Sequence, residues 1–216
     1  MPVIAIPAED ADFDRIFEIT SLAFARNEPV WDVMYPAHWT PAGRAKGSAR
    51  MLKLHQTIPE TTFIKAVDTE TGEILGMSKW NIFQNYTPKR SEVPSDVYET
   101  EEDRRYAQGI VDCFIKDRNQ AIIERNGNVV SLDILTVDPA HHRKKVGDVM
   151  VKWGTQKADE LGFDAIVESS VPGRGLYEKN GFVWQKDVVV QAEGWAEDDK
   201  ERPAGAYAWL VREKRK

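Results

Sequence analysis

The sequence has a single cysteine, Cys113, and only four histidines among its 216 residues. One thiol can form neither a disulfide within the chain nor a cysteine-rich zinc site. Four histidines leave little for a metal cluster, so we expect no metal. The chain also lacks an apolar run of the ~20 residues that cross a membrane. These absences favour a cytoplasmic protein that needs no disulfide, metal or membrane span.

The sequence also has fewer basic residues than acidic ones. Lysine and arginine total 29 against 35 aspartates and glutamates, which gives a net charge of -6 and a pI near 5.4. An acidic balance of this kind argues against a nucleic-acid partner and against an anionic membrane surface. Residues 1–11 lack the basic region and apolar run of a signal peptide, so we expect none.

What the sequence contains is a succession of short apolar strands and amphipathic helices. At this length one full domain is the default, and we predict a single domain over residues 1–216. The aromatic-rich stretch 31–39 is expected to be a loop or a broken helix. After residue 129 the order of elements predicts a βαβ unit with a parallel strand pair. Strands are expected at 3–6, 61–67, 74–83, 129–137, 164–168, 182–190 and 206–211, and helices at 13–25, 41–54, 100–126, 146–161 and 176–179.

One segment departs from this regular succession. Residues 84–98 are polar, contain Pro88 and Pro94, and cannot form a core element of their own. The helix that follows is expected to end at Asn126 and Gly127. We therefore predict an addition to the domain at about 84–127, which is placed to form a wall of a binding pocket.

The segment from His141 to Asp148 joins an expected strand to the start of a helix. It carries three adjacent cations, Arg143, Lys144 and Lys145, in an otherwise acidic chain. Backbone N–H groups in the first turn of a helix have no intrahelical partner and lie at the positive end of the helix dipole, so they suit a phosphate. A basic surface loop would have the same composition. Both interpretations stay open on these residues alone.

Two segments have a recognisable spacing. His142–Gly147, preceded by Val137, Asp138 and Pro139, can be aligned with the pattern Gln/Arg-x-x-Gly-x-Gly/Ala, and Leu176–Phe182 closely matches Leu-Tyr-Glu-Lys-x-Gly-Phe. These are the pyrophosphate loop and a downstream segment of the GNAT superfamily of acyl-CoA-dependent N-acyltransferases, which the sequence resembles over residues 132–182. Two such segments at this separation are more specific than a glycine-rich loop by itself.

Three residues of the loop differ from the pattern or conflict with its role. His142 stands where the family prefers Gln or Arg, and Lys145 replaces the first glycine, whose missing side chain allows close approach of the backbone. Asp148 places a negative charge that would face an anion bound at the helix start. We expect coenzyme A binding to be retained, because the helix dipole and the free amides do not depend on these side chains.

The resemblance implies an α/β (α+β) fold with a mixed, mostly antiparallel seven-stranded sheet, helices on both faces and one parallel central strand pair that diverges. Acetyl-CoA, or another acyl-CoA, would lie between the diverging strands. Backbone groups on the first strand would pair with its pantetheine arm, and the loop would hold its pyrophosphate. The implied cofactor-binding residues are Leu135, Thr136, Val137, His142, Arg143, Lys144, Lys145, Val146, Gly147 and Asp148.

Acyl transfer to an amine needs an acid for the departing thiolate and a base for the amine. The resemblance implies that Tyr177 is the acid, and a phenol of pKa about 10 can protonate a thiolate whose conjugate acid lies near 8.5. Asp133 is the first choice for the base and Glu168 the second. Burial would raise the pKa of Asp133, which suits a base, whereas an exposed carboxylate would keep its ordinary value. Tyr177 packing on the sheet without a catalytic role is the competing interpretation.

The acceptor would enter between the first helices and the sheet, and that part of the sequence is aromatic. Five aromatic rings could form an apolar cleft for an amine with a flat or apolar substituent, or they could simply cover the sheet. They are Trp31, Tyr35, Trp39, Trp80 and Phe83.

We predict transfer of an acetyl group from acetyl-CoA to a small-molecule amine, by a monomer or a homodimer. Two alternatives stay open. One is a non-catalytic acyl-CoA-binding module, and the other is an enzyme of the same fold that performs thioester hydrolysis, decarboxylation or cyclisation.

Overall fold

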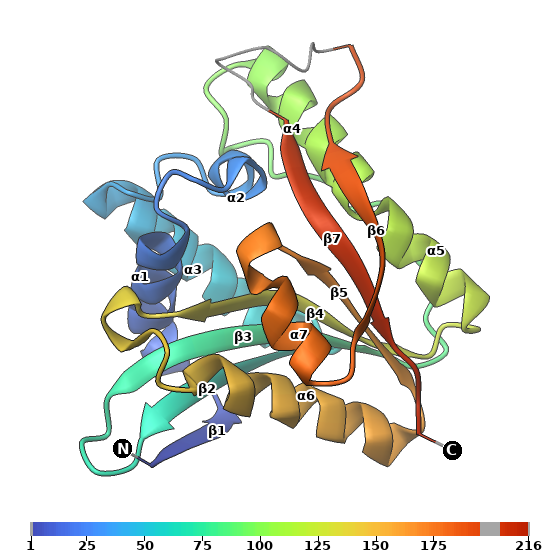
Figure 1. Cartoon of the computed structure of the whole chain (residues 1–216). Coiled ribbons are helices and arrows are strands. Elements are labelled where there is room, and N and C mark those ends of the chain that lie inside the picture. The colour runs from blue at the N-terminus through green and yellow to red at the C-terminus, as the bar shows by residue number, and fades with distance from the viewer. Residues whose placement is uncertain (1, 195–203, 216) are drawn as a thin grey trace.

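A seven-stranded sheet crosses the molecule in the order β1-β2-β3-β4-β5-β7-β6 (Figure 1). The computed structural model describes residues 2–194 and 204–215. Among the described strands only β4 and β5 run parallel, and each of the other neighbouring pairs is antiparallel. The predicted mixed sheet with one parallel central pair is confirmed. The strands are β1 (Val3–Pro7), β2 (Thr61–Asp68), β3 (Ile74–Phe83), β4 (Val129–Val137), β5 (Asp164–Ser169), β6 (Val183–Val190) and β7 (Gly205–Arg212).

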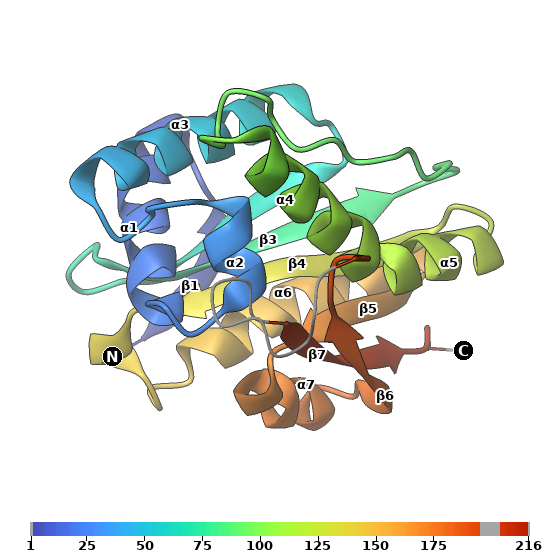
Figure 2. The same cartoon turned by 90° about the horizontal axis from the view of Figure 1, so that it is seen from above.

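Helices cover both faces of the sheet (Figures 1 and 2). One face, called here the α1–α5 face, carries α1 (Phe13–Phe24), α2 (Pro29–Met34), α3 (Pro41–Thr57), α4 (Glu101–Phe114) and α5 (Lys116–Glu124). The opposite face, called the α6 face, carries α6 (Val146–Leu161) and α7 (Arg174–Lys179). Short 3-10 turns lie at Asp10–Asp12, Pro139–His141 and Val171–Gly173. Viewed from above, α1 and α3 lie at one end of the α1–α5 face and α5 at the other (Figure 2).

The expected helix at 100–126 is two helices. Thr100 caps α4 by accepting a hydrogen bond from the backbone N–H of Asp103 at 3.0 Å, in agreement with the predicted start. Ile115, with φ of -85° and ψ of 0°, separates the two helices, and α5 begins at Lys116. The stretch 31–39 begins within the short helix α2, which starts at Pro29, a residue suited to a first helical position.

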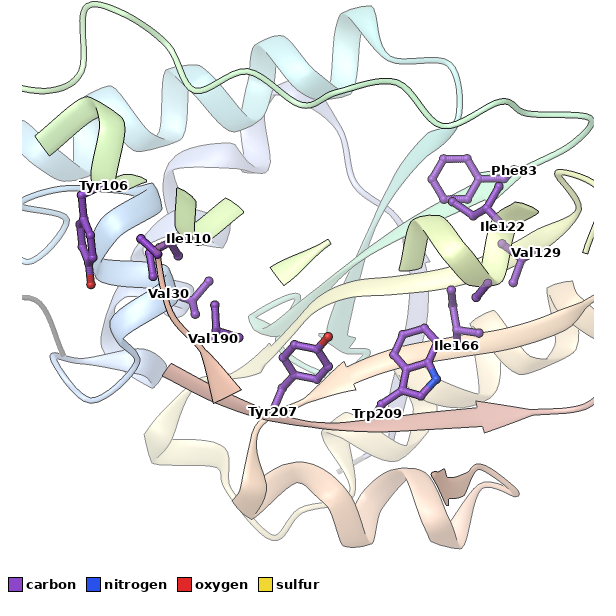
Figure 3. Close-up of a cluster of buried hydrophobic side chains, with 12 residues drawn as sticks. Val30, Phe83, Tyr106, Ile110, Ile122, Val129, Ile166, Val190, Tyr207 and Trp209 are labelled. Carbon is purple, nitrogen blue, oxygen red and sulfur yellow. The ribbon is translucent and has the colours of Figure 1, made fainter. Parts of the chain in front are cut away.

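Successive side chains along each strand point to opposite faces of the sheet, so the hydrophobic core has one part on each face. Trp80 of β3 is fully buried on the α6 face, where its ring meets Gly154 of α6. On the α1–α5 face, Phe83 packs with Ile122 of α5 and with Val129, Ile166 and Trp209 of the sheet (Figure 3). Burial of apolar surface on both faces holds the helices against the sheet.

A β-bulge in β4 breaks this alternation at one point. Lys79 of β3 pairs with Ile134, and the next residue, Trp80, pairs with Leu132, so Asp133 is an extra residue in β4. Leu132 packs in the core cluster that includes α6, whereas Ile134 packs in the cluster formed by α1 and α3. The bulge thus lets Ile134 follow Asp133 on the α1–α5 face.

Contact between α6 and the sheet depends on the absence of a side chain at Gly154. A Cβ atom there would lie 2.2 Å from the ring of Trp80. We expect Gly154→Ala to lower the free energy of unfolding by about 1–3 kcal/mol, because this core is already filled. The control is Gly175→Ala in α7, where a Cβ would meet nothing within 4 Å, and which should leave stability unchanged or slightly raised. Urea unfolding measures both, and equal stability of the two variants would contradict the packing argument.

Candidate active site

The two parallel strands, β4 and β5, separate partway along their length. Pairing runs over four positions, from Val129 opposite Asp164 to Leu132 opposite Val167. Beyond these, β4 continues to Val137 and β5 to Ser169 without pairing with each other in the described structure. The edge of β4 that contains Leu135, Thr136 and Val137 is therefore not paired with β5. This is where the pantetheine arm was expected.

The cationic loop lies at the end of β4, where α6 begins. Arg143 and Lys145 both have left-handed backbone, with φ of 62° and 63°, and Lys145 is the N-cap of α6. Lys145 thus adopts a conformation that usually favours glycine. A Cβ at Gly147 would lie 3.0 Å from Leu176 and 3.6 Å from Leu135, so the first turn of α6 packs closely on both β4 and α7. The loop keeps a shape that can present backbone N–H groups to phosphate.

Two side chains of the loop make local hydrogen bonds. His142 places Nε2 3.2 Å from the backbone oxygen of Val137. The Asp148 carboxylate lies 2.7 Å from Lys152 Nζ and accepts a 3.1 Å hydrogen bond from Asn180. The hydrogen bond from Lys152 holds the pKa of Asp148 below its usual range, and that from Asn180 acts in the same direction. The charge of Asp148 is thus engaged by residues of α6 and by Asn180 rather than left facing an anion at the helix start, as the sequence suggested.

A cavity of about 960 Å³ opens on the α1–α5 face above the point where β4 and β5 separate. Its walls come from α1, α2, α3, the segment 91–97, α4, α5 and the strands β3, β4, β5 and β7. We call it the acceptor cavity. The expected addition at 84–127 contributes one wall.

Four charged side chains form a network on the floor of this cavity. Lys79 Nζ lies 2.5 Å from Asp133, and Arg118 of α5 lies 2.6 Å from the other oxygen of Asp133. The Arg118 guanidinium also donates two hydrogen bonds of 2.9 Å to Glu168 of β5. Arg118 therefore bridges the gap between β4 and β5, and two cations balance two carboxylates.

The two carboxylates differ in proton affinity. Burial tends to raise the pKa of Asp133, but Arg118 and Lys79 together hold it well below its usual range. The rise expected for a buried Asp133 is therefore wrong, because two cations outweigh desolvation. Burial raises the pKa of Glu168, and Arg118 offsets this only in part, while Asp133 adds to the rise. Glu168 is the better proton acceptor of the two.

Tyr177 lies on α7, on the α6 face. Burial raises the pKa of its phenol. Its ring packs edge-on against Phe182 at 5.9 Å. A Cβ on Gly173 would lie 3.4 Å from the Tyr177 ring and 3.2 Å from the Ser170 hydroxyl. The same Cβ would lie 3.1 Å from the hydroxyl of Ser169, the last residue of β5, so the Tyr177 ring lies near the end of this strand.

The predicted aromatic residues do not act as one group. Trp31 and Tyr35 stack on each other with ring centroids 4.2 Å apart, and both line the acceptor cavity. Trp39 lines an adjoining cavity of about 860 Å³. The prediction was wrong for Trp80 and Phe83, which line neither of these two cavities. Trp80 is buried on the α6 face, and Phe83 is covered by α5 (Figure 3).

The sequence of residues 31–182 matches the family model described as "Acetyltransferase (GNAT) family". The match covers more than half of the chain. The protein belongs to the GNAT acetyltransferase family. The resemblance inferred from the loop and from the Leu176–Phe182 segment is thereby confirmed, and acetyl-CoA is the acyl donor that this family uses.

Solved structures share the GNAT fold at low identity. A Drosophila melanogaster polyamine N-acetyltransferase is 11% identical, with a TM-score of 0.68 and coverage of 98% of this chain and 100% of that chain. A mosquito arylalkylamine N-acetyltransferase like 5b is 13% identical, with a TM-score of 0.66 and coverage of 98% and 99%. A Sinorhizobium meliloti phosphinothricin acetyltransferase in complex with AcCoA is 17% identical, with a TM-score of 0.55 and coverage of 98% and 88%. No curated protein matches the sequence.

Two further properties concern the described residues of this GNAT protein. None of its helices combines the length and the apolar character that crossing a membrane requires. Within residues 2–194 and 204–215, no three His, Cys, Asp or Glu side chains are grouped so that they could hold a metal ion.

Sequence reasoning missed two members of the ionic network in this GNAT site, Lys79 and Arg118. A pattern pointed to each. Arg118 stands four residues after Phe114 and four before Ile122, so it interrupts the apolar stripe of the expected helix. Lys79 is the one charged residue within the apolar strand β3. A charge on a face that should be buried indicates a partner.

The pKa of Asp133 predicts a pH-dependent contribution to stability. It lies below the unfolded value near 3.9, so the contribution is complete above about pH 4 and is lost as the pH falls further. Asp133→Asn should lower the free energy of unfolding by about 3–5 kcal/mol at pH 7, because Lys79 and Arg118 lose a buried partner. The difference from wild type should shrink in urea unfolding at pH 3. Glu70→Gln, in the exposed β2–β3 turn, is the control, and a difference that does not change with pH would refute the role of Asp133.

The left-handed backbone of Lys145 predicts opposite effects on stability and on binding. Lys145→Gly should raise the free energy of unfolding by about 0.5–1 kcal/mol, because glycine adopts this conformation without strain. The same change should weaken acetyl-CoA binding a few-fold in calorimetry, because a cation beside the expected phosphate site is lost. Lys145→Asn tolerates the same backbone and should weaken binding equally. Tighter binding of both variants would show that the lysine obstructs the site.

Proposed function

We propose that this GNAT acetyltransferase transfers an acetyl group from acetyl-CoA to the amine of a small molecule bound in the acceptor cavity. The supporting observation is the position of Glu168. It lies on β5 where this strand has separated from β4, on the floor of the cavity. The Drosophila enzyme of the same fold forms N-acetylagmatine, the acetylated form of a small amine.

The donor site is formed by the edge of β4 that does not pair with β5 and by the start of α6. Acetyl-CoA, when bound, supplies the acetyl thioester. Backbone groups of Leu135, Thr136 and Val137 pair with its pantetheine arm, and a backbone amide there stabilises the charge that develops on the carbonyl oxygen. The amides of the first turn of α6, with Arg143, Lys144 and Lys145, hold the pyrophosphate. His142, Val146, Gly147 and Asp148 shape the loop around it.

Glu168 acts as the base. As the acceptor nitrogen bonds to the carbonyl carbon, Glu168 takes the proton that the nitrogen loses, directly or through water. The raised pKa of Glu168 suits this step, because a carboxylate with a higher pKa is a stronger proton acceptor. Asp133 keeps Arg118 and Lys79 in place and remains ionised. This assignment reverses the order of preference drawn from the sequence.

Tyr177 acts as the acid. When the bond between the carbonyl carbon and sulfur breaks, the Tyr177 hydroxyl gives its proton to the departing sulfur, so the proton removed at nitrogen is balanced by one delivered at sulfur. Burial keeps the phenol protonated until that moment, because it raises the pKa of the hydroxyl. Its ring near the end of β5 supports this role.

Substitution of these two residues tests the proposed reaction. We expect Glu168→Gln and Tyr177→Phe each to lower the turnover number roughly 10²–10⁴-fold, the usual range for general acid–base catalysis. Affinity for acetyl-CoA should change little. Turnover is measured as thiol release with a panel of amines, and binding as the shift in melting temperature with acetyl-CoA. Tyr86→Phe is a matched control, because this residue packs beside Phe83 and does not line the cavity.

Three outcomes separate the alternatives. A melting shift without thiol release from any amine would favour an acyl-CoA-binding module. Thiol release that needs no amine would favour thioester hydrolysis. Unchanged turnover of Tyr177→Phe would remove this residue from the mechanism while leaving the function in place.

A further inference from the structure

The α3 wall of the acceptor cavity is cationic. Lys46, Arg50 and Lys53 follow one another at intervals of four and three residues, which places them on one side of the helix. All three line the cavity. None of them forms an ion pair with a carboxylate among the described residues. The described part of the chain therefore leaves these three positive charges without an ion-pair partner.

Arg50 is the most buried of the three cations. Its guanidinium lies 4.5 Å from the centroid of the Tyr35 ring and donates one hydrogen bond to the backbone oxygen of Met34. A guanidinium has five N–H donors, so four have no protein acceptor in the described structure. Arg118 on the cavity floor differs, because two carboxylates neutralise it. A half-buried cation without a counter-ion favours an anionic ligand.

A second unsatisfied donor lies in the same wall. Trp31 is only 4% exposed, and its indole N–H is buried without a hydrogen-bond partner. Trp31 lines the cavity and stacks on Tyr35, the ring that Arg50 also contacts. Unsatisfied buried donors are rare, and one in a cavity wall indicates a ligand that brings an acceptor atom.

Tyr35 also links this wall to the reaction centre. Burial raises its pKa to about 12, and it lies close enough to both Arg50 and Asp133 for the first to lower its pKa and the second to raise it. Tyr35 is thus coupled electrostatically both to Arg50 on the α3 wall and to Asp133 on the cavity floor.

Acidic side chains line other parts of the cavity. Glu28 stands at the start of α2, where burial, with a contribution from Asp32, raises its pKa to about 6. Glu92 and Asp96 are exposed on the segment 91–97. These residues attract an incoming ammonium group, whereas the α3 wall attracts an anion. The charge pattern fits an acceptor that carries both groups.

We propose that the acceptor is an amino carboxylate, with its carboxylate bound by Arg50 and flanked by Lys46 and Lys53. This inference rests on the proposed function, because it concerns the second half of the same acceptor site. Arg50 provides a forked pair of N–H donors that matches a carboxylate, and the two lysines add charge at the rim. Arg50 is a specificity-determining residue and takes no part in proton transfer.

The first test compares matched acceptors on the wild-type enzyme. Each pair differs only in the carboxylate: phenylalanine with phenethylamine, tryptophan with tryptamine, and histidine with histamine. Thiol release at saturating acetyl-CoA gives kcat/KM. We expect the amino acid of at least one pair to exceed its amine by roughly 10- to 100-fold, the value of a charged hydrogen-bonded contact. Equal values, or preference for the amine in all pairs, would overturn the proposal.

The second test uses variants of α3. Arg50→Gln should raise KM for the preferred amino acid roughly 10- to 100-fold and change kcat/KM for its decarboxylated partner less than about twofold. Arg50→Lys should restore part of the loss. Arg44→Gln is the matched control, because Arg44 is on the same helix, loses the same charge and does not line either cavity. If Arg50→Gln lowers the melting temperature strongly, the exposed pair Lys46→Gln and Lys53→Gln replaces it, with the same expected direction.

The outcomes separate this proposal from the proposed function. Acetylation of amines without discrimination for a carboxylate, or an equal loss with both acceptors in Arg50→Gln, would overturn the amino carboxylate and leave the acetyltransferase in place. Absence of acetylation with every acceptor, while acetyl-CoA still raises the melting temperature, would overturn both.

Discussion

The structure of the site depends on one guanidinium. Where β4 and β5 stop pairing, backbone hydrogen bonds no longer hold the two strands together. Each strand presents a carboxylate on the α1–α5 face, that of Glu168 buried and that of Asp133 half-buried. Two such carboxylates would repel each other and draw in water. Arg118 hydrogen-bonds to both Asp133 and Glu168 and so fixes the width of the gap from one side. A gap of stable width is what the proposed placement of the acetyl-CoA thioester between the strands requires.

The same network explains why two neighbouring carboxylates have different proton affinities. Asp133 lies between Arg118 and Lys79, whereas Arg118 is the one cation paired with Glu168 among the described residues. The β-bulge creates this asymmetry, because it adds one residue to β4 and directs Asp133 toward Lys79 of the next strand. A small irregularity in strand pairing thereby separates a permanently charged group from one able to take a proton.

The segment 84–127 connects the chemistry to the acceptor side. It supplies Arg118 to the floor of the cavity and the exposed acidic residues of 91–97 to its rim. On the opposite wall, α3 supplies cations that have no acidic partner in the described structure. In the proposed function, recognition of the acceptor thus comes from elements outside the βαβ unit, while the donor site belongs to β4 and α6. Such a division allows the acceptor to change while the donor site is kept.

Local sequence pattern determined much of this protein. Strand β4 and helix α6 have the bounds that periodicity and their flanking residues predicted, and the loop and the Leu176–Phe182 segment indicated the family before any coordinates. These features depend on neighbours in the chain, such as Gly162 just after α6, and a sequence displays them directly.

Contacts between distant residues were decided only by the tertiary structure. No local pattern predicts that Arg118 forms ion pairs with Asp133 and Glu168. These residues are 15 and 50 positions away in the sequence, and they come into contact only after the strands have paired. The bulge at Asp133 depends on the register between β3 and β4, which also decides that Trp80 faces α6 and not the acceptor. The direction of the Asp133 pKa shift also depends on these contacts. Burial raises this pKa and the two cations lower it, and only the positions of Arg118 and Lys79 decide which effect is larger.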